Sequence, residues 1–116
     1  MGDRYGQFVE RLKAALFTAP GDTDRAMRSA IEARSATLGG RSDSAAAVAR
    51  VPTNLERYVD TVARHAYRVT DDDVQARKDA GYSEDALFEI TACAAVGAGL
   101  GRLERGLLVL REARRA

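Results

Sequence analysis

The chain has few of the residues from which redox, metal and disulfide sites are built. Its 116 residues include one cysteine, Cys93, one histidine, His65, and no tryptophan. A single cysteine excludes an intrachain disulfide and a Cys-x-x-Cys pair, and one histidine is too few for a typical zinc site. We therefore predict no metal and no cofactor. The sparing use of cysteine suits a reducing, cytoplasmic environment.

An excess of charge of one sign is also absent, because 18 basic and 17 acidic residues leave a net charge of +1. This balance gives no general attraction to nucleic acid or to anionic membranes. The start of the chain lacks the basic segment and apolar run of a signal peptide. The charge-free run from Ile90 to Gly101 is shorter than the about 20 residues that span a bilayer. We expect neither nucleic acid nor membrane as a partner.

Apolar residues recur with helical spacing in five segments, and no segment alternates with the period of a strand. The sequence predicts an all-α bundle of about five helices in one domain, residues 1–116. It divides into an N-terminal helical hairpin at 1–38, a linker at 39–51 and a helical core at 52–116. Aromatic residues make up only 6% of the chain, so the core must use small side chains. Self-association would add buried area to such a core.

Helix ends are marked most clearly in the second half of the chain. Thr53 and Glu56 have the spacing of a capping box. Thr70 precedes three aspartates, which we interpret as caps rather than metal ligands, because successive helical residues point about 100° apart. Further signals are a cap for the second helix at Asp22 or Thr23, a left-handed stop at Gly81, a cap at Ser83 and an Asp60–Arg64 ion-pair spacing.

The last predicted helix, from Ser83 to about Ala113, has a middle made almost entirely of small residues. Eight of the ten residues from Ala92 to Gly101 are Ala, Cys or Gly. Each glycine inside a helix costs about 1 kcal/mol relative to alanine, so this composition indicates close contact with other backbone. The dinucleotide-binding fingerprint fails, since Arg102 stands at its third glycine. We predict an interface formed by Ala95, Gly97, Gly99 and Gly101.

Three residues are candidates for catalysis. His65 is suited to act as a general base near neutral pH, and Glu89 or Tyr58 could orient it. Tyr67 is a further candidate partner. The alternative interpretation is that His65 packs at the flank of an apolar helix face. Cys93 lies in the part of the last helix where nearly all side chains are small, so we expect a buried and unreactive thiol.

A tight turn at Asp79–Ser83 between two helices also permits a helix-turn-helix hypothesis. Its second helix would begin with Glu84 and Asp85 and carry Glu89. Carboxylates repel phosphates, and base-reading side chains are missing until Arg102. DNA binding is therefore the remote alternative.

Four short motifs stand between residues 69 and 107. They are Val69-Thr-Asp-Asp-Asp-Val74, Ala80-Gly-Tyr-Ser-Glu-Asp85, Leu87-Phe-Glu-Ile90 and Arg102-Leu103. This part of the chain resembles the C-terminal half of the alkylhydroperoxidase-like, or carboxymuconolactone decarboxylase-like, family. The resemblance implies an all-α fold and assembly into dimers, trimers or hexamers through helix packing.

Peroxidase members of that family carry a Cys-x-x-Cys-x-x-x-His motif, which this chain lacks. With Cys93 at its first position, Val96 and Leu100 replace the second cysteine and the histidine. Thiol peroxidase activity is therefore not expected. The main hypothesis is a homo-oligomeric binding or accessory protein, with an unknown small-molecule ligand or protein partner. The alternative is a cofactor-independent decarboxylase or isomerase with His65 as base.

Overall fold

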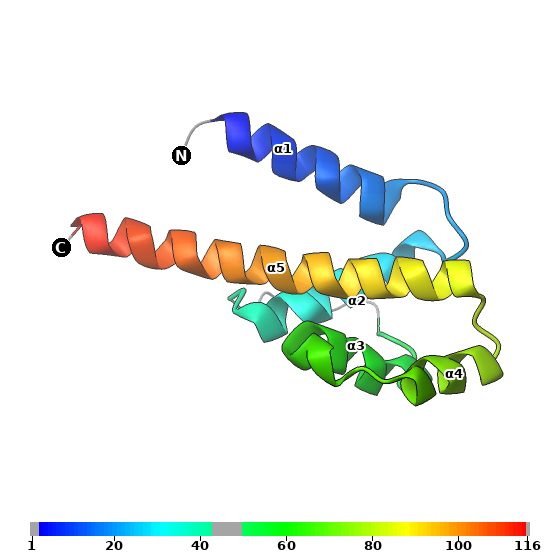
Figure 1. The fold of residues 1–116 in the computed structure, drawn as a ribbon. Coiled ribbons are helices and arrows are strands. Elements are labelled where there is room, and N and C mark those ends of the chain that lie inside the picture. Colours follow the sequence, from blue (N-terminus) through cyan, green and yellow to red (C-terminus); the bar gives the residue numbers. More distant parts are fainter. Residues whose placement is uncertain (1–2, 43–49, 116) are drawn as a thin grey trace.

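The computed structural model describes residues 3–42 and 50–115 and contains helices but no strand in those ranges. The prediction of an all-α fold with a long C-terminal helix is confirmed. The elements, in chain order, are α1 (Asp3–Lys13), a π-helical turn η1 (Ala14–Thr18), α2 (Arg25–Gly39), α3 (Thr53–His65), a 3-10 turn η2 (Ala66–Arg68), α4 (Asp71–Asp79) and α5 (Glu84–Arg115) (Figure 1).

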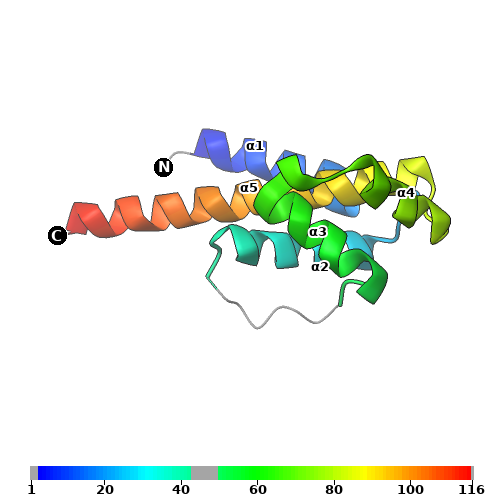
Figure 2. The same cartoon turned by 60° about the horizontal axis from the view of Figure 1, so that its bottom comes forward.

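Helix α5 is the axis of the molecule, and the other helices are arranged around it. Helix α2 packs along α5, while α3 and α4 cover a second side (Figures 1 and 2). Helix α1 runs beside the C-terminal half of α5, with a wide separation between the two backbones (Figure 1). The C-terminal end of α5 extends beyond α2, α3 and α4 (Figure 2). Much of this end is therefore not covered by the bundle.

The hydrophobic core lies where α2, α3 and α5 meet. Ile31, Leu55, Val59 and Ile90 are fully buried there. The apolar face of α3 is buried from Leu55 to Ala63. The α-helix ends at His65 and the chain continues as η2, so the face does not continue through residue 66, which is exposed.

The predicted helix ends in the second half of the chain are largely confirmed. Thr70 and Asp73 form a reciprocal capping box at the start of α4. Gly81 has a φ of 105°, the left-handed conformation that favours glycine. The Ser83 hydroxyl accepts a hydrogen bond from the Ala86 backbone N–H at 3.0 Å and so caps α5. Each of these three ends is formed by hydrogen bonds or a backbone conformation within a few residues.

Two predicted caps are wrong. Asp24 caps α2 by accepting a hydrogen bond from the Met27 N–H at 2.7 Å, because the preceding residues, 22 and 23, contact α5. At α3 the residue before the helix is Pro52, and no side chain caps this end. Thr53 is the first helical residue, and Glu56 lies 3.5 Å from Arg34 instead of closing a capping box.

The predicted linker at 39–51 is only partly described. Helix α2 ends at Gly39, and Gly40 follows with a φ of 127°. The expectation of a short alanine-rich helix concerns residues 43–49, which lie outside the described residues.

Candidate functional site

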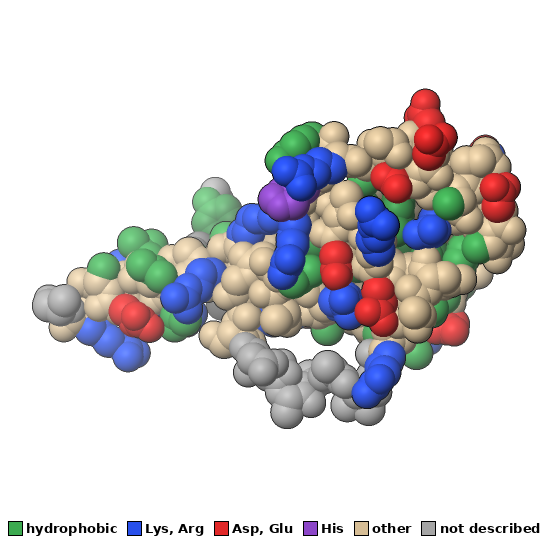
Figure 3. Space-filling model, turned by 90° about the horizontal axis from the view of Figure 1, so that it is seen from below, with side chains coloured by type: hydrophobic (Ala, Val, Ile, Leu, Met, Phe, Trp, Pro, Cys, Tyr) green, Lys and Arg blue, Asp and Glu red, His purple; other side chains and the backbone are tan. Residues whose placement is uncertain are grey.

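An open groove of about 720 Å³ runs along α3 and is bordered by residues of α2, η2 and α4. Four of its lining side chains are Arg57, Arg64, His65 and Arg68. Figure 3 shows the histidine among arginines on this surface, with carboxylates nearby. We call this hollow the α3 groove. It brings these three arginines and the histidine of the chain onto one surface.

The carboxylates of the α3 groove are already engaged. Asp60 accepts hydrogen bonds from Arg34 Nε and Nη2 at 2.6 and 2.8 Å, a bidentate pair that joins α3 to α2. Asp73 accepts the Thr70 backbone N–H in the α4 capping box, which lowers the pKa of its carboxyl. The Asp60–Arg64 ion pair suggested by the sequence is therefore wrong. The Asp60 carboxylate pairs with Arg34 instead.

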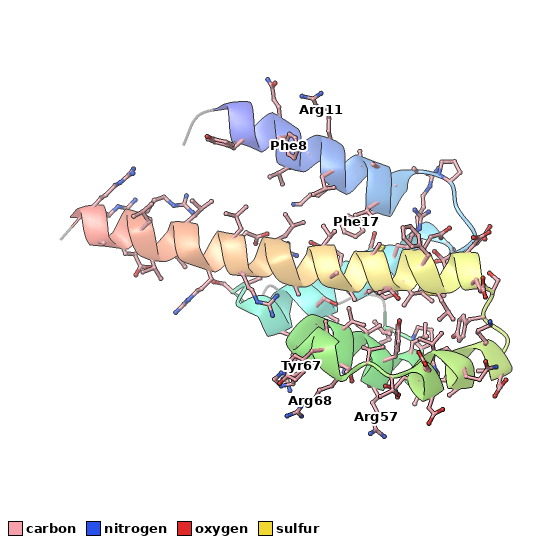
Figure 4. The ribbon with its side chains drawn as sticks, viewed as in Figure 1. Phe8, Arg11, Phe17, Arg57, Tyr67 and Arg68 are labelled. Carbon is pink, nitrogen blue, oxygen red and sulfur yellow. The ribbon has the colours of Figure 1, made fainter. Side chains whose placement is uncertain are left out.

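Within the described residues, the guanidinium groups of Arg57, Arg64 and Arg68 make no hydrogen bond or ion pair with another side chain or with the backbone. All three are exposed, and Figure 4 shows Arg57 and Arg68 pointing away from the body of the molecule. The Arg68 guanidinium lies 5.7 Å from the centre of the Tyr67 ring, within cation–π range. Since their nearest carboxylates are taken, these arginines leave the groove with donors for an anion.

The three candidate catalytic residues lie in different environments. His65 is exposed in the α3 groove, and its ring meets the Tyr67 ring edge-on at 5.8 Å. Tyr58 is buried, and its hydroxyl lies 2.7 Å from Thr91 Oγ1. Thr91 gives its own hydrogen to the Leu87 carbonyl, so the Tyr58 hydroxyl is the donor. Of the proposed partners of His65, only Tyr67 contacts it.

Glu89 anchors the segment that precedes α2. Its carboxylate accepts hydrogen bonds from the Thr23 hydroxyl at 2.6 Å, the Thr23 N–H at 2.9 Å and the Asp22 N–H at 2.8 Å. The Thr23 hydroxyl, followed by the backbone donors, lowers the pKa of Glu89. No local pattern of residues indicates this contact, because it joins residues that are 66 and 67 positions apart.

Cys93 is fully buried between η1 and the core. Burial raises the pKa of its thiol to about 11, and the nearby charge of Arg28 only partly opposes this. A thiol that stays protonated at neutral pH is a poor nucleophile. Cys93 therefore acts as a small apolar side chain.

The four residues predicted to form an interface divide between two faces of α5. Gly97 and Gly101 face α2: a Cβ atom on Gly97 would lie 2.8 Å from the Glu32 carbonyl oxygen, and one on Gly101 would overlap Ala36. Ala95 and Gly99 are exposed on the opposite side. The small residues at 97 and 101 thus allow close packing within the chain.

Ala95 and Gly99 belong to a longer apolar stripe, which we call the outer face. It follows helical spacing and carries no charge. Phe88, Leu103 and Leu110 on it are 72%, 47% and 48% exposed. The outer face consists of Phe88, Ala92, Ala95, Gly99, Leu103, Gly106, Leu110 and Ala113.

Helix α5 also satisfies the length and composition of a membrane-spanning helix, with a mean hydropathy of 1.4 over 18 residues. Half of that window is buried within the fold. A core helix of a folded domain satisfies the same criteria.

Comparison of the chain with protein-family models, curated proteins and solved structures finds no match. The α3 groove and the outer face of α5 are therefore the features that bear on function.

Proposed function

We propose that the protein is a homo-oligomeric helical module that binds a small anionic ligand. The outer face of α5 is the surface for self-association, and the α3 groove is the ligand site. The observation that carries this proposal is the exposure of an uninterrupted apolar face on the central helix.

The outer face differs from ordinary scattered surface hydrophobics. Its eight residues continue from Phe88 to Ala113 without a charged side chain, over a length of about 38 Å at the rise of an α-helix. Contiguous apolar patches of this kind mark interaction sites on soluble proteins. A second helix packed on this face would remove the patch from water.

Two neighbouring residues near the end of α5 provide a matched test. Leu110 lies on the outer face and Val109 lies beside it, and their exposures are 48% and 51%. Leu110→Glu places a charge in the proposed contact and is expected to reduce the species seen by sedimentation to the 12.5 kDa monomer. Val109→Glu is expected to keep the mass of the wild-type assembly.

The same experiment separates self-association from other uses of the outer face. A wild-type protein that is monomeric at every concentration would overturn the proposed assembly. A monomer that floats with phosphatidylcholine vesicles would assign the face to lipid instead. Equal dissociation by the two glutamate variants would show that the contact is elsewhere on α5.

The ligand-binding part of the proposal is supported by the arginines of the α3 groove. Guanidinium groups bind carboxylates and phosphates through paired N–H donors. Arg57, Arg64 and Arg68 line one groove, and the acids around them have other partners within the fold. An oxyanion would supply the acceptors that these donors lack.

Titration with inorganic phosphate and with succinate tests the α3 groove, and calorimetry distinguishes the two oxyanions. Arg64→Gln is expected to weaken binding about tenfold, as for the loss of one charge-assisted hydrogen bond. Arg11→Gln is the matched control, because Arg11 is exposed on α1 (Figure 4). Equal affinity for both variants, or no heat from wild type with either anion, would refute this site.

The proposal also keeps the resemblance to alkylhydroperoxidase-like proteins, without their redox centre. The Thr70 capping box and the Gly81 turn support it, because both belong to the resembling motifs. The buried Cys93 offers no peroxidatic thiol. The enzyme alternative has less support, since Glu89 and Tyr58 are engaged away from His65.

A further inference from the structure

From Phe88 to Leu110, the outer face of α5 is symmetric in spacing about Gly99. Ala95 and Leu103 lie four residues before and after it, and Ala92 and Gly106 lie seven residues before and after it. These distances correspond to about one and two helical turns. Phe88 and Leu110 continue the pattern at eleven residues on each side, about three turns away.

The side chains nearest the centre of this symmetry are suited to a close crossing. If two copies of α5 cross antiparallel with Gly99 on a twofold axis, Gly99 meets Gly99 and the backbones approach closely. At the next turn Ala95 meets Leu103, a small side chain against a large one. Interdigitation of large and small side chains is the usual condition for well-packed helix pairs.

From this arrangement we infer that a second copy of the chain pairs with the outer face through an antiparallel α5–α5 contact centred on Gly99. The inference rests on the proposed self-association and adds its direction and register. Residues at equal distances from Gly99 face each other across the interface. An isologous twofold contact of this kind is the commonest geometry of homodimers.

Charges at the two ends of α5 favour the antiparallel direction. Glu84 and Arg114 lie fifteen residues on either side of Gly99, so the twofold axis places the acid of one copy at the same level along the pair as the arginine of the other. Glu84 already bonds Lys78 at 2.9 Å, but its side chain remains 80% exposed. A parallel pair would place arginine beside arginine, which is unfavourable.

The shape of the molecule agrees with this direction. The C-terminal end of α5 projects beyond the helices that cover its first half (Figure 2). In an antiparallel pair, each projecting end lies along the first half of the partner's α5. The apolar residues Leu103 and Leu110 on that end are then covered by a second copy rather than by water.

Disulfide trapping distinguishes the two directions. The variants Ala95→Cys and Leu103→Cys are mixed in equal amounts and oxidised with copper(II) phenanthroline, which accepts two electrons from each pair of thiols while their two protons are released to solvent. We expect a covalent dimer in the mixture, little in either variant alone, and a self-linked dimer of Gly99→Cys. Native Cys93 is buried, so the wild-type protein is expected to form no cross-link and gives the background level.

The outcomes separate this inference from the proposed self-association. Self-linking of Ala95→Cys alone, as strong as that of the mixture, would replace the antiparallel register with a parallel one. Loss of all three cross-links in a protein that still sediments as an oligomer would refute the α5–α5 contact only. A monomeric wild type would refute both.

A charge-reversal pair provides a test without cysteines. Glu84→Arg and Arg114→Glu are each expected to weaken dimerisation by a few fold, as exposed ion pairs do. The double variant is expected to recover most of the loss, because the pair is restored across the axis. Additive losses in the double variant would contradict the contact between the two ends.

Discussion

Two faces of α5 have similar compositions but different surroundings. On the inner face, Gly97 and Gly101 lie against α2, where a Cβ atom at either position would come within 3.0 Å of helix backbone. On the outer face, a Cβ atom at Gly99 or Gly106 would have no atom within 4 Å apart from the adjoining backbone of α5 itself. Both faces include small residues four apart, Gly97 and Gly101 on one and Ala95 and Gly99 on the other, yet only the first pair is packed against another helix of the chain.

The difference shows what each glycine contributes. At Gly97 and Gly101 the close contact between α2 and α5 offsets the cost of a flexible residue in a helix. At Gly99 and Gly106 the single chain offers no such contact, although each glycine lowers helix stability by about 1 kcal/mol relative to alanine. A close contact with another molecule would offset the cost in helix stability at Gly99 and Gly106, as the contact with α2 does at Gly97 and Gly101.

The largest expected effect comes from adding one methyl group to each face. Gly101→Ala drives a Cβ atom into the backbone of Ala36, so we expect a loss in the free energy of unfolding of about 3 kcal/mol, the upper end of the usual cost of overpacking. Gly99→Ala meets open space and is expected to raise the stability of the monomer by up to about 1 kcal/mol. Urea unfolding at low protein concentration measures both.

The same pair of variants separates folding from assembly. Gly99→Ala holds the two copies of α5 apart at the proposed axis, so it is expected to weaken dimerisation while the monomer becomes more stable. Equal unfolding free energies for the two alanine variants would contradict the proposed difference in packing between the two faces. A more stable Gly99→Ala dimer would remove Gly99 from the contact.

Much of the fold follows from local sequence signals. Five helices, the caps at Thr70 and Ser83, the turn at Gly81 and the buried Cys93 agree with the sequence analysis. Each depends on hydrogen bonds or spacing within a few residues. Such patterns can be interpreted before the tertiary packing is known.

The remaining features depend on contacts between distant segments. The ion pair between Arg34 and Asp60 could not be predicted from the sequence, and neither could the hydrogen bonds from the segment before Asp24 to Glu89. Both depend on how the helices pack. It also could not assign Gly97 and Gly99 to opposite environments. Both belong to pairs of small residues four apart, and only the position of α2 distinguishes them.

Two carboxylates tie the inner face of α5 to the N-terminal half of the chain. Glu89 holds residues 22 and 23 before α2, and Glu104 binds Arg41 Nη2 at 2.6 Å after α2. The Thr23 hydroxyl lowers the pKa of Glu89, and the Arg41 guanidinium lowers the pKa of Glu104. No comparable anchor lies on the outer face, which carries no charge.

These pKa shifts predict that acid weakens the inner face. Both groups have folded-state pKa values below the ordinary carboxyl value of 4.5. Their contribution to stability is therefore complete above that pH and is lost as pH falls through the folded-state values. Unfolding free energies measured from pH 7 to pH 3 are expected to decrease along this range.

Glu89→Gln gives the most specific check on this anchoring. The amide keeps the size of the side chain but loses the charge that strengthens bonds to Asp22 and Thr23, so we expect a loss of about 1–3 kcal/mol at neutral pH and a flatter pH profile. Glu112→Gln, on the exposed end of α5, is the matched control. An unchanged pH profile in Glu89→Gln would mean that another group carries the acid sensitivity. The contact of α5 with the N-terminal segment would then depend on apolar packing alone, like the outer face.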